Sequence, residues 1–222
     1  IPAEAPQLTG PAVTVPTAGL AVALLVAAGA PQSAAEPPLE DEPAPGLDVG
    51  AIPPELLEIA WEVRGRPIGE RMAAISAPLL GRPYVNDAAG EGVAPDPDPP
   101  ARYDAFDCLT FVEEVLALAL PGDPRSAPAV RRQLRYGIDQ PPSYDNRNHF
   151  MLEEWIPNAI EAGFLRDITA ELGETHLLDK TVTAKTWAWW KKRSLFQLSD
   201  ARLPKGRYAL PVMSLGAAAD VV

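Results

Sequence analysis

The sequence predicts an α+β fold, with a helical N-terminal part and a small antiparallel sheet towards the C-terminus. Several stretches before residue 170 place apolar residues at helical spacing. The last part of the chain instead holds short apolar runs such as GRYALPVMSL, which are typical of strands. With 222 residues, 47% of them hydrophobic, the chain is long enough to bury one sizeable core.

The composition narrows the classes of function. Acidic residues number 30 against 19 basic ones, a formal net charge of −11, which argues against nucleic-acid binding. One cysteine excludes an internal disulfide, and with two histidines it leaves no typical zinc-binding set. We therefore expect no metal, no cofactor and no nucleic-acid partner, and a monomer in solution.

The first fifty residues differ from the rest. The apolar run AGLAVALLVAAGA, at 18–30, is shorter than the roughly 20 residues that a membrane-spanning helix needs. Small residues follow at 33–35, in the manner of a secretory signal and its cleavage site, and 36–46 is an acidic, proline-rich linker. The alternative is a disordered Ala/Pro-rich tail. We expect a periplasmic or secreted protein without a stable membrane span, whose folded domain covers 51–222.

The elements of that domain follow in chain order. PPELLEIAWEV and IGERMAAISAPLL predict two helices, and the turn-rich stretch 86–102 predicts a long loop. FDCLTFVEEVLALAL predicts a third helix that ends before Pro121 and Gly122. A fourth helix is expected within 147–169, with Gly163 as its stop.

The segment TWAWWKKRSLF, at 186–196, permits two interpretations. Its tryptophans and the basic residues after them match an amphipathic edge that rests on a membrane or a glycan. The alternative, which we favour, is a helix that packs its tryptophans into the core and keeps its basic residues outside.

Cys108 is the first candidate for chemistry. Its place on an apolar helical stripe with Phe111, Val112 and Val115 favours an ordinary buried cysteine. Asp107 is a good N-cap, however, and it puts Cys108 in the first turn, where free amides and the helix dipole favour a thiolate. The same amides would stabilise an oxyanion. Position therefore favours a nucleophile.

A thiol nucleophile needs a base, which is normally a histidine. His149 stands just before an amphipathic helix, between Asn148 and Phe150, and a capping or surface role is its alternative. His176 lies among charged residues and is expected to face solvent. Within these residues His149 is the best candidate for the base.

Three motifs together resemble a known family. GRPYV, FDCLTFVE and RNHFMLEEWIPNAIEAGFLRDIT, between about residues 65 and 170, are similar to a bacterial envelope family described as N-acetylmuramoyl-L-alanine amidase-like. That family is related to the NlpC-type cell-wall cysteine peptidases. The resemblance implies a papain-like fold and an exported enzyme that cleaves an amide bond of peptidoglycan or a muropeptide. It also implies that Cys108 is the nucleophile.

The resemblance assigns the other site residues less directly. The NlpC-type base opens a strand in a His-x-Gly pattern, which neither His149 nor His176 matches. Either His149 serves as the base, or the catalytic strand lies beyond Val222 and the sheet of this chain is incomplete. The candidate substrate-binding residues are Asp107, Tyr103 and Arg147. Arg147 is expected to bind a carboxylate of the stem peptide. For Tyr103 a packing role is an equal alternative.

Two functions compete. The first is a cysteine amidase or stem-peptide endopeptidase with Cys108 as nucleophile and a histidine base. The second is a non-catalytic envelope-binding protein that keeps the fold without a full catalytic set. Glu113, which also matches the family pattern, is expected to pair with a base or anchor a loop rather than to touch the thiol.

Overall fold

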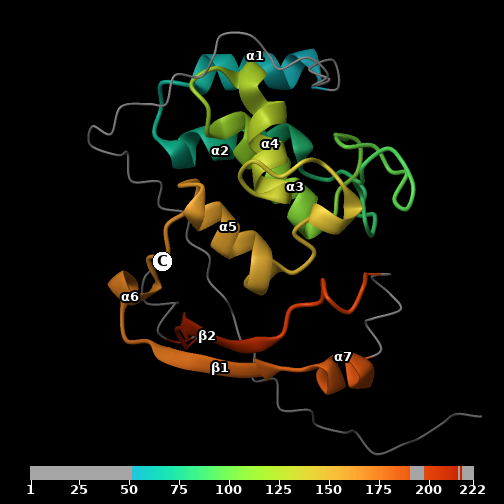
Figure 1. The fold of residues 1–222 in the computed structure, drawn as a ribbon. Helices are drawn as coiled ribbons and strands as arrows, with labels where there is room; N and C mark the ends of the chain where they lie inside the picture. The colour runs from blue at the N-terminus through green and yellow to red at the C-terminus, as the bar shows by residue number, and fades with distance from the viewer. Residues whose placement is uncertain (1–51, 191–197, 215, 217–222) are drawn as a thin grey trace, which may run out of the picture.

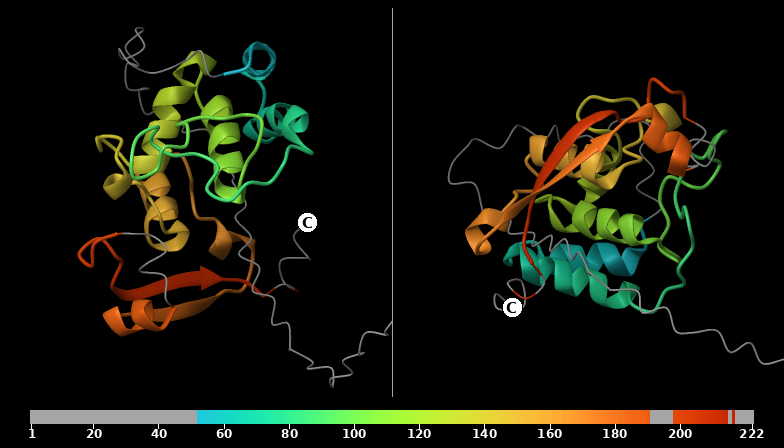
Figure 2. Two further views of the ribbon diagram at one scale, coloured as in Figure 1. Left: turned by 90° about the vertical axis from the view of Figure 1, so that its right-hand side faces the viewer. Right: turned by 90° about the horizontal axis from the view of Figure 1, so that it is seen from below.

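The computed structural model describes residues 52–190, 198–214 and 216. The signal-like segment and the linker predicted over 1–50 lie outside these residues, as does the basic stretch 191–193. The chain folds into a group of helices and, beside it, a two-stranded hairpin (Figures 1 and 2).

Three helices form the first part of the core, and all three were predicted. They are α1 (Pro54–Val63), α2 (Ile68–Ser76), which continues into the 3-10 turn η2 (Ala77–Leu79), and α3 (Cys108–Ala119). Proline at the first position of α1 suits a helix start, because the missing N–H would have no partner there. One face of each helix is buried in a common cluster, in which Leu56, Ile75 and Leu118 are at most 2% exposed.

A second cluster joins α3 to the next helices. The helix α4 (Ala127–Tyr136) follows the 3-10 turn η3 (Pro124–Ser126), and the π-helical turn η5 (Met151–Trp155) runs into α5 (Ile156–Glu161). Leu116, Leu134 and Trp155 are almost fully buried where these elements meet. The fourth helix was predicted within 147–169, whereas α4 and the π-helical turn were not.

The C-terminal part adds the short α6 (Thr169–Leu172), β1 (His176–Val182), α7 (Ala184–Trp190) and β2 (Gly206–Val212). The two strands pair antiparallel from His176 with Val212 to Val182 with Gly206. In Figures 1 and 2 this hairpin lies on the α5 side of the helical group. The strand β2 was predicted and β1 was not.

A third cluster attaches the hairpin to the segment before α5. It consists of Phe150, Val182, Trp187, Leu198 and Leu203. Trp187 is 3% exposed and its indole N–H donates to the carbonyl of Pro204 at 2.8 Å. For Trp187, the interpretation of TWAWWKKRSLF as a core-packing helix is therefore confirmed.

The architecture is mostly helical, with one small antiparallel sheet of two strands in the described part of the chain. The predicted helical N-terminal part and small antiparallel sheet are thus both present. None of the described helices combines the length and apolar character that a bilayer span requires.

Candidate active site

Cys108 is the first residue of α3 and its side chain is exposed. The predicted N-cap is confirmed: Asp107 Oδ1 accepts the amides of Leu109 at 2.9 Å and Thr110 at 2.8 Å. Thr110 Oγ1 in turn accepts the amide of Asp107 at 3.0 Å, which completes a capping box. The apolar residues from Val115 to Ala119 are buried behind Cys108, whereas the cysteine itself is exposed, so the alternative of an ordinary buried cysteine does not hold.

The cap changes the source of oxyanion stabilisation. Because Asp107 accepts the amides of Leu109 and Thr110, these N–H groups are not free to bind an oxyanion as the sequence led us to expect. Within the described residues, the amide of Cys108 has no recorded acceptor. A nucleophile's own amide is one of the donors that acyl-transfer enzymes use. Cys108 would therefore supply both the attacking sulfur and one oxyanion donor.

His149 precedes the π-helical turn η5. Its Nε2 lies 2.7 Å from the carbonyl oxygen of Tyr144, and its ring packs edge-on against the Tyr144 ring at 4.6 Å between centroids. A carbonyl only accepts, so this contact assigns the proton to Nε2 and the lone pair to Nδ1 in the neutral ring. Burial lowers the pKa of His149, against the opposing effect of the Tyr144 hydrogen bond. The net lowering of the pKa favours the neutral imidazole, which can accept a proton.

His149 and the residues on either side of Cys108 share one cavity of about 510 Å³. Asp107, Leu109 and Thr110 line it from α3, and Cys108 is not among the lining residues. The others come from the loop after GRPYV, from α4 and from the segment around His149: Asn86, Asp87, Ala89, Arg135, Tyr144, Arg147, Asn148 and His149. The structure thus brings the two candidate catalytic residues to the same region, with Cys108 next to the cavity wall rather than in it. His176 is exposed at the start of β1 and does not line this cavity.

Arg147 also lines the cavity, but loop 86–102 already engages its guanidinium. Two of its nitrogens donate to the carboxylate of Glu91 at 2.9 and 2.8 Å, and a contact of 2.5 Å joins Nη2 to Asp96. Nη1 donates to the carbonyl of Ala89 at 3.1 Å. Arg147 therefore holds this loop as a wall of the cavity. A substrate carboxylate would have to share the guanidinium with Glu91 and Asp96, so its substrate-binding role stays a prediction.

The remaining predicted substrate-binding residues have structural contacts. Tyr103 is 7% exposed within the first core cluster, and its hydroxyl accepts from Arg131 Nη2 at 2.8 Å. Burial raises the pKa of Tyr103, so the hydroxyl stays protonated. It does not line the cavity, and the packing alternative describes it better than substrate binding does. Asp107 faces the cavity but is committed to its cap and to the amide of Ala88 at 3.3 Å.

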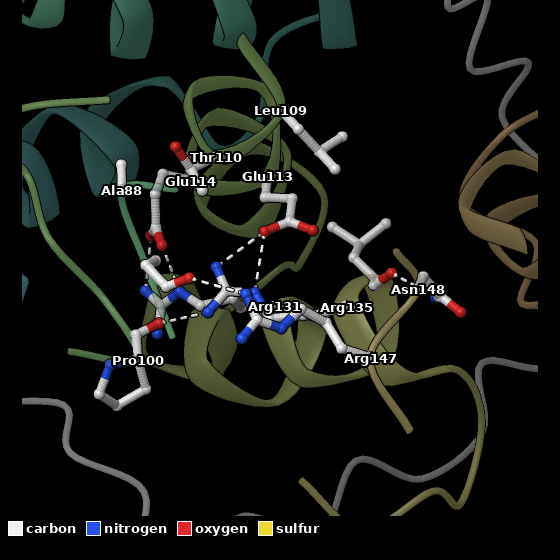
Figure 3. Close-up of polar contacts among 12 residues, drawn as sticks. Ala88, Pro100, Leu109, Thr110, Glu113, Glu114, Arg131, Arg135, Arg147 and Asn148 are labelled. Carbon is white, nitrogen blue, oxygen red and sulfur yellow. Dashed lines mark hydrogen bonds and ion pairs between the residues drawn. The ribbon is translucent and has the colours of Figure 1, made fainter. Parts of the chain in front are cut away.

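Two buried ion pairs hold α3 against α4 (Figure 3). Arg131 forms a fork with Glu114, with both contacts at 2.6 Å. Arg135 donates twice to Glu113 Oε2, at 3.0 and 2.7 Å, and to the carbonyl of Pro100 at 2.7 Å. Glu113 therefore pairs with a basic residue, as predicted, and that residue is Arg135. These pairs fix the helix that carries Cys108.

Sequence reasoning missed the residues that orient His149. Tyr144 supplies the carbonyl for Nε2, and Glu154 accepts the amide of His149 at 2.9 Å. Their short separations from the histidine were the available signal, since SYDNRNHFMLEE holds all three. Within the described ranges, no three His, Cys, Asp or Glu side chains gather as metal ligands would.

The fold and the site define a mostly helical protein with a small antiparallel sheet and an exposed cysteine at a capped helix start. The chain belongs to the AmiA-like family, described as N-acetylmuramoyl-L-alanine amidase-like, whose model matches residues 74–199. The match contains Cys108 and both histidines, so the sequence-based resemblance is confirmed.

A solved structure shares the fold. It is the crystal structure of protein LPG0564 from Legionella pneumophila str. Philadelphia 1, of the DUF1460 family model, with a TM-score of 0.58 and 24% identity. The match covers 71% of this chain and 60% of that one, so this chain spans less than two thirds of the Legionella chain. No curated protein matches the sequence.

Proposed function

We propose that this chain hydrolyses an amide bond of peptidoglycan, with Cys108 as nucleophile and His149 as base. The observation that carries the proposal is the exposed Cys108 at the capped start of α3, with both of its chain neighbours on the cavity that also holds His149. Membership of an amidase-like family supports the type of bond. The proposed setting is the periplasm or the cell exterior, and the proposed fold relation is to papain-like enzymes.

The residues suit an acyl-transfer sequence. Cys108 Sγ bonds to the carbonyl carbon as its proton passes to His149 Nδ1, and the carbonyl electron pair moves to the oxygen, near the Cys108 amide. The oxyanion then collapses, the C–N bond breaks, and His149 returns the proton to the leaving amine. Water, deprotonated by His149, attacks the thioester and releases a carboxylic acid and the free thiol.

The sugar–peptide amide and the amides within the stem peptide are the two proposed targets. Asp87 and Asn86 offer oxygen acceptors on the cavity wall, and the Arg147 guanidinium, which already pairs with Glu91 and Asp96, lies there as well. A muropeptide presents amides, hydroxyls and carboxylates to such a mixed polar surface. Asp107 and Arg147 are the residues we propose to face the substrate.

The direct test is release of soluble fragments from purified peptidoglycan by the full chain. We expect Cys108→Ser and His149→Gln each to reduce release by about 100-fold or more, since nucleophile and base act as a unit. His176→Gln is the matched control, because His176 is exposed and does not line the cavity. Full activity in Cys108→Ser would refute the proposal. Mass spectrometry of the fragments identifies the bond.

One observation favours the alternative of a non-catalytic peptidoglycan-binding protein. Cys108 is not among the residues that line the cavity, so a ligand can occupy the cavity without touching the sulfur. This alternative predicts that the protein sediments with sacculi and releases no fragments. It also predicts equal binding by wild type and Cys108→Ser.

A further inference from the structure

Arg202 reaches from the segment between α7 and β2 to the stretch that carries His149. Its Nη2 donates to the carbonyl of Arg147 at 2.8 Å, and its Nε donates to the carbonyl of Asp145. Its Nη1 lies 2.5 Å from Glu154 Oε1. These three acceptors flank His149 on both sides of the sequence. A planar guanidinium bonded in three directions leaves little freedom to the backbone that it contacts.

Glu154 links Arg202 to His149 through its carboxylate. While one oxygen of its carboxylate faces Arg202, the other accepts the amides of His149 at 2.9 Å and Phe150 at 3.3 Å. The side chain of Glu154 is 14% exposed and that of Arg202 28% exposed, so water screens this ion pair only partly. The backbone of the histidine is therefore tied, through one carboxylate, to an arginine from the hairpin side of the molecule.

The ring of His149 depends on the same turn. Its Nε2 contacts the carbonyl of Tyr144, and the next carbonyl along the chain, that of Asp145, is held by Arg202. A shift of this turn would rotate the imidazole and exchange its tautomer. We propose that Arg202 is a positioning residue that keeps the His149 imidazole in one orientation and tautomer. The inference rests on the proposed function of His149 as base.

Charge and geometry have to be separated in any test. Besides burial and the Tyr144 carbonyl, three charged groups face His149: Arg147 and Arg202 lower its pKa, and Glu154 raises it. Replacing Arg202 with glutamine removes a positive charge and loosens the turn. Replacing it with lysine keeps the charge, but one ammonium group on a flexible stem cannot hold three acceptors in the same planar fork. The two variants therefore distinguish a positioning role from a purely electrostatic one.

The first experiment follows the imidazole directly. The chain has two histidines, so its NMR spectrum contains two imidazole Cε1–H signals. The signal that disappears in His176→Gln belongs to His176, and the other belongs to His149. We expect both Arg202→Gln and Arg202→Lys to move the His149 signal, while the His176 signal stays in place. Only Arg202→Gln, which removes a positive charge that lowers the His149 pKa, is also expected to raise the titration midpoint. A His149 signal unchanged in Arg202→Lys would overturn the inference.

The second experiment measures turnover with peptidoglycan fragments. We expect kcat to fall about 10-fold to 100-fold in both variants, the range a small misplacement of a catalytic group can produce, with KM within about twofold of wild type. Arg207→Gln is the matched control, because Arg207 is an arginine of the same region whose ion pair with Asp179 is exposed. Circular dichroism checks that each variant folds. Wild-type kcat in Arg202→Lys would overturn the inference.

The two proposals can fail separately. If wild type and His149→Gln have equal activity, the proposed function fails, and the NMR experiment still decides whether Arg202 orients the ring. If His149→Gln is inactive and Arg202→Lys is unaffected in both measurements, the positioning role fails and the proposed function stands.

Discussion

The ion pairs between α3 and α4 and the ion pair between the two strands of the hairpin differ in burial. In the pairs Arg131–Glu114 and Arg135–Glu113, between α3 and α4, no side chain is more than 8% exposed. The hairpin pair Arg207–Asp179 joins β2 to β1 with side chains 74% and 41% exposed. In the first region the charges are structural parts of the core, because an unpaired charge there would be costly. In the second, water solvates them whether or not they pair.

The candidate site draws on both regions. Cys108 belongs to the helix that the buried pairs hold, so its position is a property of the helical part. His149 lies where the hairpin cluster begins, since its neighbour Phe150 packs against Trp187 with ring centroids 5.0 Å apart. The proposed nucleophile is thus supported by a large core and the proposed base by a small one. Substitutions in the two regions should therefore affect stability and activity differently.

The largest effect is expected from breaking a buried pair. Glu113→Gln keeps the shape of the side chain but leaves Arg135 without its anion, and Trp155 Nε1 also donates to this carboxylate at 3.0 Å. We expect a loss of about 3–5 kcal/mol in the free energy of unfolding, measured by urea denaturation of the full chain. Glu113→Met combined with Arg135→Met should recover part of the loss, because it removes both charges. A loss below about 1 kcal/mol in Glu113→Gln would contradict the structural role of the pair.

The hairpin cluster should respond locally. Trp187→Phe removes the hydrogen bond to the Pro204 carbonyl and part of the buried area, for an expected loss of about 1–2 kcal/mol. Hydrogen exchange should show faster opening of β1 and β2, with α3 amides unchanged. Equal loss of protection in α3 would mean that the two regions unfold as one unit.

The helix cap of Cys108 should give a somewhat smaller effect. Asp107→Ala removes the acceptor of two amides at the start of α3, at an expected cost of about 1 kcal/mol in thermal or urea unfolding. Thr110→Val is the matched variant and should cost less, because it removes the Oγ1 contacts with the Asp107 amide and carboxylate but keeps both amide bonds to Asp107 Oδ1. An equal or larger loss in Thr110→Val would mean that the threonine, not the aspartate, provides the main cap.

The helix of Cys108 was predictable because its signals are local. A capping residue, an apolar stripe and a proline-glycine break all lie within one short stretch, and the helix begins and ends where they place it. The strand β2 was predictable for the same reason. The family resemblance likewise rested on short motifs, FDCLTFVE among them.

The missed features depend on distant partners. In α4, Arg131 and Arg135 at helical spacing predict a solvent-facing side, and they are buried only because Glu113 and Glu114 face them from α3. The cue was an acidic pair inside the apolar run VEEVLALAL. The clamp of Arg147 on loop 86–102 joins segments far apart in sequence, so no local pattern predicts it. The contacts of Arg202 with the His149 segment are of the same kind.

A pH dependence follows from the burial of His149. Because its folded pKa lies below the usual value of about 6.5, the folded state binds fewer protons than the unfolded state just below that pH. The stability contributed by the neutral ring is therefore present above about pH 6.5 and is lost as pH falls through the folded pKa. Urea denaturation between about pH 7 and pH 5 should show a smaller loss in His149→Gln than in wild type. If the loss of stability between pH 7 and pH 5 were unchanged in His149→Gln and reduced in His176→Gln, His176 and not His149 would cause the pH dependence.

The smallest effect is expected at the exposed pair of the hairpin. Arg207→Gln removes the contacts with Asp179, but both side chains are exposed, so water replaces the partner at little expense. We expect no measurable change in the urea midpoint or in the His149 NMR signal. Since Arg207 and Arg202 flank the start of the same strand, this variant tests whether any lost arginine in the hairpin region disturbs His149. If Arg207→Gln shifted the His149 NMR signal as much as Arg202→Gln does, the whole hairpin would support His149 as one unit. The burial of an ion pair would then no longer predict which arginine affects His149.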